Sequence, residues 1–175
     1  MKQFLFLACC IAVLAACNNE SATIKEEKKP EASNIQLPFT AAYSSQWNDK
    51  VSDADLLTVL NSYKHWQDND MKALDAVMAD TVSFESHSGF KYNGPKAELL
   101  AMWTKSRDSL SKVDLVMDAW VKSHSLDKNT DFVTVWYKEI DTYKDGRVDS
   151  AYYVDDNLVE KGKISWYAQT KRVLK

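Results

Sequence analysis

The stretch YKHWQDNDMKALDAVMAD, residues 63–80, decides the fold that this sequence predicts. Tyr63 and Trp66 end an apolar stripe with helical spacing, and the polar residues 68–70 favour a break directly after it. Apolar residues three and four positions apart then mark one face of a second, short helix. They are Met71, Leu74, Val77 and Met78. The stretch therefore predicts two consecutive helices before the chain enters a sheet.

The segments on either side extend this pattern. The first helix is expected to begin at Ser52, a residue type that caps helix N-termini well, and acidic residues occupy its first turn. Residues 81–86 alternate as a short strand, with Phe84 on its apolar side. A loop over 89–93 and Pro95 near a first helical turn then predict a third helix.

The rest of the chain is rich in β-forming residues. Four segments are expected to be strands, namely 113–123, 131–143, 148–159 and 164–173. Asp145-Gly146 and Lys161-Gly162 are hairpin turn signals between the last three. Regular alternation in the first segment would place five residues on one face, namely Val113, Leu115, Met117, Ala119 and Val121. The elements together predict an α+β domain.

This order of elements, from Ser52 to the C-terminus, resembles the nuclear transport factor 2-like superfamily, and its SnoaL-like branch in particular. Three local patterns carry the resemblance: residues 63–80, the helix entry FKYNGPKAEL at 90–99, and the turn EKGKI at 160–164. The resemblance implies a strongly curved, mostly antiparallel sheet that wraps around three helices as a cone. A pocket is expected at the open end of that cone.

Some members of this family are ketosteroid isomerases or polyketide cyclases, and others only bind. The isomerase reaction needs a carboxylate base and a hydrogen-bond donor for the developing oxyanion. The resemblance puts the base position on Ser86 and the donor tyrosine on Ser62, with Tyr63 rotated off that face. Because serine cannot act as this base, the sequence favours binding without catalysis. Asp118 and His87 are the candidate replacement bases, and exposure to solvent is the alternative for both.

Aromatic residues occur in nearly every predicted element, and some of them should line an apolar pocket. The predicted pocket consists of Tyr63, Trp66, Phe84, Ser86, Trp103, Trp120, Trp136, Lys138, Tyr152 and Trp166. If Trp136 points inward, then Val133, Val135 and Tyr137 form an outward apolar strip, which suggests a homodimer interface. The chain has no histidine spacing typical of a metal site, and no cofactor is expected.

The N-terminus carries the features of an export signal. Lys2 precedes an apolar run over 4–14, which is shorter than the roughly 20 residues of a membrane-spanning helix. Leu14-Ala15-Ala16-Cys17 resembles the lipobox of bacterial lipoproteins, in which the cysteine is acylated and becomes the first residue. We therefore expect residues 1–16 to be a signal peptide and the mature chain to be held in a membrane of the cell envelope, inner or outer, through lipid on Cys17.

Composition limits what the mature chain can do. Residues 17–50 are polar and charged, as in a flexible tether, and residues 51–175 are enough for one domain. All three cysteines lie within residues 1–17, so the domain has no thiol chemistry. A net charge of −3 makes nucleic acid an improbable partner. Three hypotheses follow: a binder of a small apolar or aromatic ligand, an isomerase, cyclase or dehydratase, and a protein-interaction module.

Overall fold

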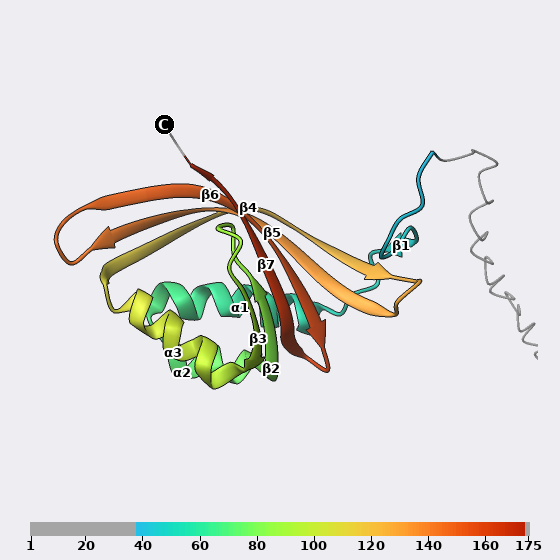
Figure 1. Ribbon diagram of the computed structural model, residues 1–175, viewed down its shortest axis with the longest axis horizontal. Coiled ribbons are helices and arrows are strands. Elements are labelled where there is room, and N and C mark those ends of the chain that lie inside the picture. Colours follow the sequence, from blue (N-terminus) through green and yellow to red (C-terminus); the bar gives the residue numbers. More distant parts are fainter. Residues whose placement is uncertain (1–37, 174–175) are drawn as a thin grey trace, which may run out of the picture. The chain divides into compact units, whose positions relative to one another are not determined.

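The computed structural model describes residues 38–173 (Figure 1). By their internal contacts residues 39–175 form one compact unit. Residues 39–50, which the sequence assigned to the tether, therefore belong to this unit. Cys17 and the expected signal peptide lie outside the described residues. No helix in the described part of the chain is long and apolar enough to cross a membrane.

Three helices form where the sequence predicts them: α1 (Asp53–Asp68), α2 (Met71–Val77) and α3 (Lys96–Arg107). The Ser52 hydroxyl caps α1 by accepting a 3.0 Å hydrogen bond from the Asp55 backbone N–H. Asn69 ends α1 in the left-handed conformation, with φ of 59°. The Asp70 side chain then caps α2 by accepting a hydrogen bond from Ala73 N. The break predicted at 68–70 is confirmed.

Seven strands form one sheet. They are β1 (Trp47–Asn48), β2 (Met78–Glu85), β3 (Lys91–Pro95), β4 (Leu110–Ser125), β5 (Thr130–Tyr143), β6 (Val148–Glu160) and β7 (Lys163–Val173). Their order is β1-β4-β5-β6-β7-β2-β3, and every neighbouring pair is antiparallel except β2 with β7. The helices lie together on one side of this curved sheet (Figure 1). The α+β cone is confirmed, whereas β1 and the strand β3 within the expected loop were not predicted.

A bulge in β4 reverses the expected alternation. Met117 lies opposite Tyr137 of β5, but Ala119 lies opposite Trp136, so Asp118 is an extra residue in β4. After this extra residue, Trp120 lies on the same face of the sheet as Met117. The prediction of one continuous face from Val113 to Val121 is therefore wrong after Met117.

The two faces of β5 are the reverse of those expected. Val133, Val135 and Tyr137 are 0–2% exposed and belong to the core under the helices, whereas Trp136 is 36% exposed on the other face. The prediction that these three residues form an outward strip is wrong. Side chains alternate along a strand, so Trp136 and Tyr137 must lie on opposite faces of the sheet. The helices cover the face that carries Tyr137. We call this covered side the inner face and the opposite side the outer face.

Candidate functional site

A cavity of about 200 Å³ lies between the helices and the inner face of the sheet. Aromatic side chains from six elements form most of its wall, namely Tyr63, Trp66, Phe84, Trp103, Tyr137, Tyr153 and Tyr167. Phe84 stacks on Tyr167 with ring centroids 5.1 Å apart and meets Trp103 edge-on at 5.5 Å. The polar groups in the wall include Glu139, Ser106 and Gln169. The cavity is therefore largely apolar with a few polar groups, as is typical of small-molecule sites.

Asp155 of β6 is a fully buried carboxylate beneath this wall. Its Oδ2 atom accepts hydrogen bonds from the hydroxyls of Tyr137 at 2.7 Å, Tyr167 at 2.9 Å and Tyr63 at 3.1 Å. These tyrosines come from β5, β7 and α1, so the carboxylate ties the sheet to the first helix. We call Asp155 and its three tyrosines the tyrosine–carboxylate cluster.

Two amide side chains complete the hydrogen bonds of this cluster. Asn157 Nδ2 donates to the Tyr63 hydroxyl oxygen at 3.1 Å, and Gln169 Nε2 donates to that of Tyr167 at 2.9 Å. Gln169 Oε1 lies 3.1 Å from His87 Nδ1, so the ring nitrogen is the donor in this contact. The chain of hydrogen bonds thus runs from the exposed His87 to the buried Asp155.

Burial dominates the electrostatics of Asp155. It raises the pKa of this carboxyl group to about 7, although the three tyrosine hydrogen bonds act in the opposite direction. Burial also raises the pKa of Tyr63, Tyr137 and Tyr167 well above the usual value, so these phenols stay protonated and act as donors. Oδ1 of Asp155 is buried and has no hydrogen-bond partner among residues 38–173.

Glu139 of β5 is the acidic residue in the cavity wall. Burial and then the neighbouring Asp141 raise its pKa to about 8. The hydrogen bond between the two side chains raises the pKa of Glu139. The same bond lowers the pKa of Asp141, against the effect of burial. Glu139 therefore holds the shared proton. At neutral pH the cavity therefore contains a neutral carboxylic acid, which can donate a hydrogen bond or a proton.

The structure places four of the predicted pocket residues on the cavity wall, namely Tyr63, Trp66, Phe84 and Trp103. It does not place there Ser86, Trp120, Trp136, Lys138, Tyr152 or Trp166. Trp120 shares the inner face but is half-exposed, and the last four lie on the outer face. Ser86 instead hydrogen-bonds Ser88 in the loop after β2.

The expected replacement bases lie away from the cavity wall. Asp118 is exposed at the bulge of β4. His87 is exposed and reaches the tyrosine–carboxylate cluster only through Gln169. Tyr63, which the sequence placed off the donor face, points into the cluster, whereas the neighbouring Ser62 donates to Val59 O within α1. Among residues 38–173, no three His, Cys, Asp or Glu side chains group as metal ligands would.

Sequence reasoning missed the two buried acids and most of the tyrosines around them. Tyr137, Tyr153 and Tyr167 each follow directly after a residue that was assigned to the pocket, so the error is one residue in each strand. Asp155 stands in a strand whose neighbours on the same face are Tyr153 and Asn157. An acidic residue flanked in this way by inward residues was the signal that could have identified it.

The fold is that of the nuclear transport factor 2-like proteins. No family model matches the chain, and a search of curated proteins finds no match. Among solved structures, an epoxide hydrolase from M. tuberculosis shares 10% identity over 68% of this chain and 83% of its own, with a TM-score of 0.58. A nuclear transport factor 2-like protein of unknown function from Burkholderia pseudomallei shares 15% identity over 69% of this chain and 92% of its own, with a TM-score of 0.53.

A third similar structure is a candidate polyketide cyclase from Xanthomonas campestris. It shares 17% identity over 67% of this chain and 89% of its own, with a TM-score of 0.54. At these identities the likeness establishes the fold alone. The activity of this chain has to be argued from its own cavity.

Proposed function

We propose that the cone binds a small, largely apolar molecule that carries one oxygen function, such as a carbonyl or hydroxyl group. The observation that supports this proposal is the cavity itself, in which an aromatic wall surrounds one acidic side chain, Glu139. The rings would bury the apolar part of the ligand. The carboxylic acid would donate a hydrogen bond to its oxygen and so orient it.

The size of the cavity limits the ligand. An apolar protein cavity of about 150 Å³ holds benzene. A cavity of about 200 Å³ is therefore suited to a single ring with a short substituent. The ligand would be smaller than the drug-sized molecules that fill pockets of about 300–1,000 Å³.

The hydrogen bonds already present occupy several hydroxyls near the cavity, whereas Glu139 is an acidic donor in its wall. The hydroxyls of Tyr63, Tyr137 and Tyr167 donate to Asp155, and Ser62 donates to a backbone carbonyl. A ligand that used them would leave the buried Asp155 carboxylate unpaired, which is costly. Glu139 shares its proton with Asp141 at the wall of the cavity, where a ligand oxygen can compete for it.

A second candidate function is general acid–base catalysis next to a carbonyl group. Glu139, with a pKa of about 8, lines the apolar cavity, and Asp155, with a pKa of about 7, lies behind the tyrosines of its wall. Raised pKa values of this kind are frequent at catalytic sites. Solved structures with this fold include an epoxide hydrolase and a candidate polyketide cyclase, which is consistent with catalysis on such a scaffold.

We also propose that the domain acts at a membrane surface of the cell envelope. The lipobox-like sequence ending at Cys17 supports an acyl anchor. Two or more acyl chains hold a protein stably on a bilayer, whereas one does so only marginally. A small apolar ligand would partition into the same membrane, so the anchored domain would meet it there.

Binding is tested by thermal unfolding of residues 39–175 with acetophenone, cyclohexanone, p-cresol and toluene as probes. A probe at about ten times its Kd should stabilise the native state by roughly 1.4 kcal/mol and raise Tm by about 3–6 °C. We expect the oxygen-bearing probes to give larger shifts than toluene. Glu139→Ala should remove the difference in Tm shift between the oxygen-bearing probes and toluene. Trp136→Ala, a change on the outer face, should leave this difference in place. Equal shifts for all four probes, or none, would contradict the proposal.

Catalysis is tested separately by hydrogen–deuterium exchange. The α-protons of cyclohexanone in D₂O should exchange faster with the wild-type protein than in buffer, because Glu139 donates a proton to the carbonyl oxygen while solvent takes up the α-proton, which gives the enol. Glu139→Gln should abolish this acceleration while it retains binding, since the amide can still donate a hydrogen bond. Binding without any acceleration would leave the chain as a ligand-binding protein and exclude the catalytic candidate for this probe.

A further inference from the structure

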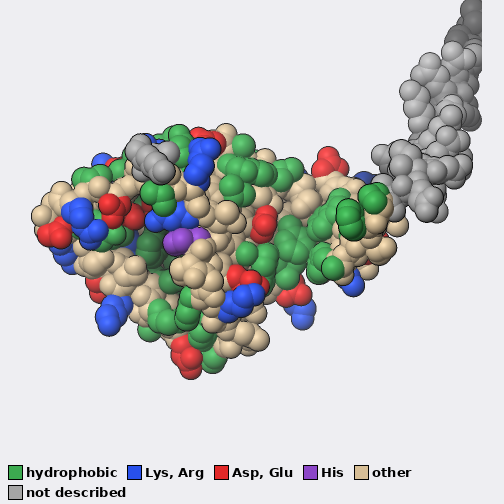
Figure 2. Space-filling view, turned by 45° about the horizontal axis from the view of Figure 1, so that its top comes forward, with side chains coloured by type: hydrophobic (Ala, Val, Ile, Leu, Met, Phe, Trp, Pro, Cys, Tyr) green, Lys and Arg blue, Asp and Glu red, His purple; other side chains and the backbone are tan. Residues whose placement is uncertain are grey.

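A second and larger hollow lies on the outer face of the sheet, separate from the cone. Its volume is about 950 Å³, and β2, β4, β5, β6 and β7 contribute to it together with the segment that contains β1. Hydrophobic side chains gather between the middle of the molecule and its β1 end (Figure 2). We call this hollow the outer groove.

Four aromatic rings form a continuous row in the outer groove. Tyr43 stacks near Trp47, with ring centroids 6.3 Å apart, and Trp47 meets Phe132 edge-on at 5.8 Å. Phe132 in turn meets Trp166 edge-on at 6.2 Å. Tyr43 and Trp47 are 46% and 44% exposed, so their ring surfaces are open to solvent.

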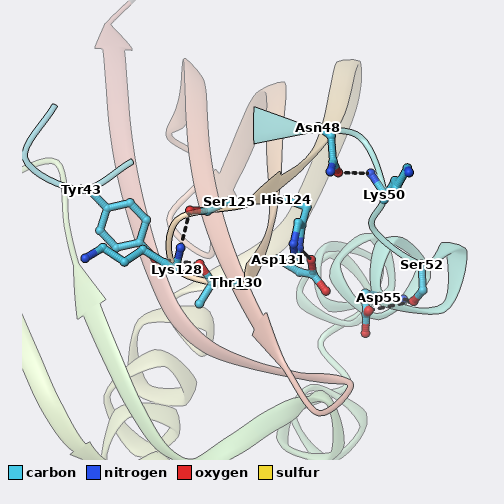
Figure 3. Close-up of polar contacts among 10 residues, drawn as sticks. All are labelled: Tyr43, Asn48, Lys50, Ser52, Asp55, His124, Ser125, Lys128, Thr130 and Asp131. Carbon is cyan, nitrogen blue, oxygen red and sulfur yellow. Dashed lines mark hydrogen bonds and ion pairs between the residues drawn. The ribbon is translucent and has the colours of Figure 1, made fainter. Parts of the chain in front are cut away.

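The segment that carries the first two rings is held in place by specific contacts. The Tyr43 hydroxyl lies 2.8 Å from the Thr130 hydroxyl, and Ser45 N donates to Asp127 Oδ2 at 2.8 Å. Figure 3 shows Tyr43 at the hairpin between β4 and β5, where the Lys128 ammonium lies 5.8 Å from its ring centroid. The aromatic row is therefore part of the fold.

The polar groups of the outer groove are hydroxyls and carboxylates. Its described lining contains Thr81, Ser83, Ser123, Thr134, Ser165, Asp156 and Glu160, and no Lys, Arg or His. Ser165 is the extra residue of a bulge in β7, and its buried hydroxyl has no hydrogen-bond partner among the described residues.

We propose that the outer groove binds a neutral carbohydrate. The C–H face of a sugar ring is apolar and flat enough to stack on an exposed aromatic ring, while its hydroxyls can donate to carboxylates and exchange hydrogen bonds with Ser and Thr. A row of rings bordered by such side chains provides both kinds of contact. With Asp156 and Glu160 present and no basic residue in the lining, an anionic sugar would be repelled.

A second copy of this chain suits the groove less well. A twofold contact brings the same residues of both copies together. Asp156 and Glu160 of the two copies would then be desolvated in one interface, without a basic partner from the lining. A neutral ligand avoids this cost because it satisfies the carboxylates with hydroxyl donors.

The test is calorimetric titration of residues 39–175 with maltotriose, cellotriose and N,N′,N″-triacetylchitotriose, each up to about 10 mM, a range that detects even a millimolar Kd. At least one probe should bind, and Trp47→Ala and Trp166→Ala should each weaken it at least about tenfold. Trp120→Ala is the matched control, because Trp120 is half-exposed on the other face and should not change binding. Circular dichroism checks that each variant is folded.

Three results would overturn the proposal. The first is no heat of binding with any of the three probes. The second is unchanged affinity for the probe in both Trp47→Ala and Trp166→Ala. The third is a loss of affinity in Trp120→Ala as large as in those two variants. Light scattering is measured on the same samples. A dimer that Trp166→Ala converts into a monomer would assign the outer groove to a second copy instead.

Discussion

Asp155 is a fully buried acid whose environment sets the pH dependence that we expect for the folded state. Burial raises its pKa to about 7, from an ordinary value of 3.8, and that of Glu139 to about 8, from 4.5. The folded state therefore binds protons more tightly than the unfolded state between these values. By linkage, the free energy of unfolding is largest at low pH within this window and falls as pH rises from about 4 to about 8.

Asp155→Asn should remove part of this slope between about pH 4 and 7, and the part due to Glu139 should remain. The wild-type protein loses on the order of 4 kcal/mol at most from Asp155 over that range, which is about three pKa units at 1.36 kcal/mol each. The neutral amide cannot titrate, and its oxygen can still accept from the tyrosines. Urea unfolding at pH 5 and pH 8 measures the difference.

Asp156→Asn is the control for this measurement, because Asp156 is exposed on the outer face next to Asp155. It should keep most of the wild-type slope, because the charge of Asp156 is a smaller cause of the raised pKa of Asp155 than burial is. A slope that survives in Asp155→Asn and disappears in Asp156→Asn would contradict the assignment of the buried acid.

The elements show how far the sequence predicts this structure. Helix boundaries depend on local chemistry, so the Ser52 cap and the break at 68–70 were predictable. The faces of the strands were not predictable, because β5, β6 and β7 each contain two adjacent aromatic residues. One residue of each pair lies on each face of the sheet. These pairs are Trp136-Tyr137, Tyr152-Tyr153 and Trp166-Tyr167. In each pair the second residue, a tyrosine, faces the cavity.

Bulges in β4 and β7 explain part of this failure. Asp118 in β4 and Ser165 in β7 each add one residue, and one extra residue moves every following side chain to the opposite face. The sequence around them has no glycine to mark either bulge. The predicted site was correct on the helices and at Phe84 of β2, and wrong at Ser86 and on the later strands. The Ser165 bulge turns Trp166 to the outer face, whereas β5 and β6 pair without a bulge and were simply assigned the wrong face.

Arg107 joins two helices and the sheet. Its guanidinium, 4% exposed, donates to Trp66 O at 3.0 Å, Gln67 O at 3.1 Å and Leu110 O at 3.4 Å. It thereby donates to two carbonyls at the C-terminal end of α1, that of Gln67 and that of Trp66, which also accepts from Asn69 N.

Arg107→Met should lower the free energy of unfolding by about 2–4 kcal/mol, because buried carbonyls lose their donors. Lys105→Met, an exposed change in the same turn of α3, should alter it by less than about 0.5 kcal/mol. Urea unfolding of both variants measures this. Equal small effects would show that the guanidinium contributes little to the end of α1.

At the scale of the whole molecule, the proposal joins a ligand-binding cone to a membrane anchor. Cys17→Ser in the full chain should abolish incorporation of radiolabelled palmitate and move the protein from the membrane fraction to the soluble fraction. Cys9→Ser, which changes a cysteine inside the apolar run, should leave both unchanged. Membrane retention of an unlabelled Cys17→Ser protein would contradict the acyl anchor.

The central claim is that the cone binds a single-ring molecule beside Glu139, and the most direct measurement is intermolecular NOE spectroscopy. With acetophenone as the probe, its ring protons should show NOEs to Phe84, Trp103 and Tyr167, which line the cavity. Its methyl protons should show NOEs to the Glu139 side chain. NOEs confined to outer-face rings such as Trp136, or none at saturating probe, would contradict the claim.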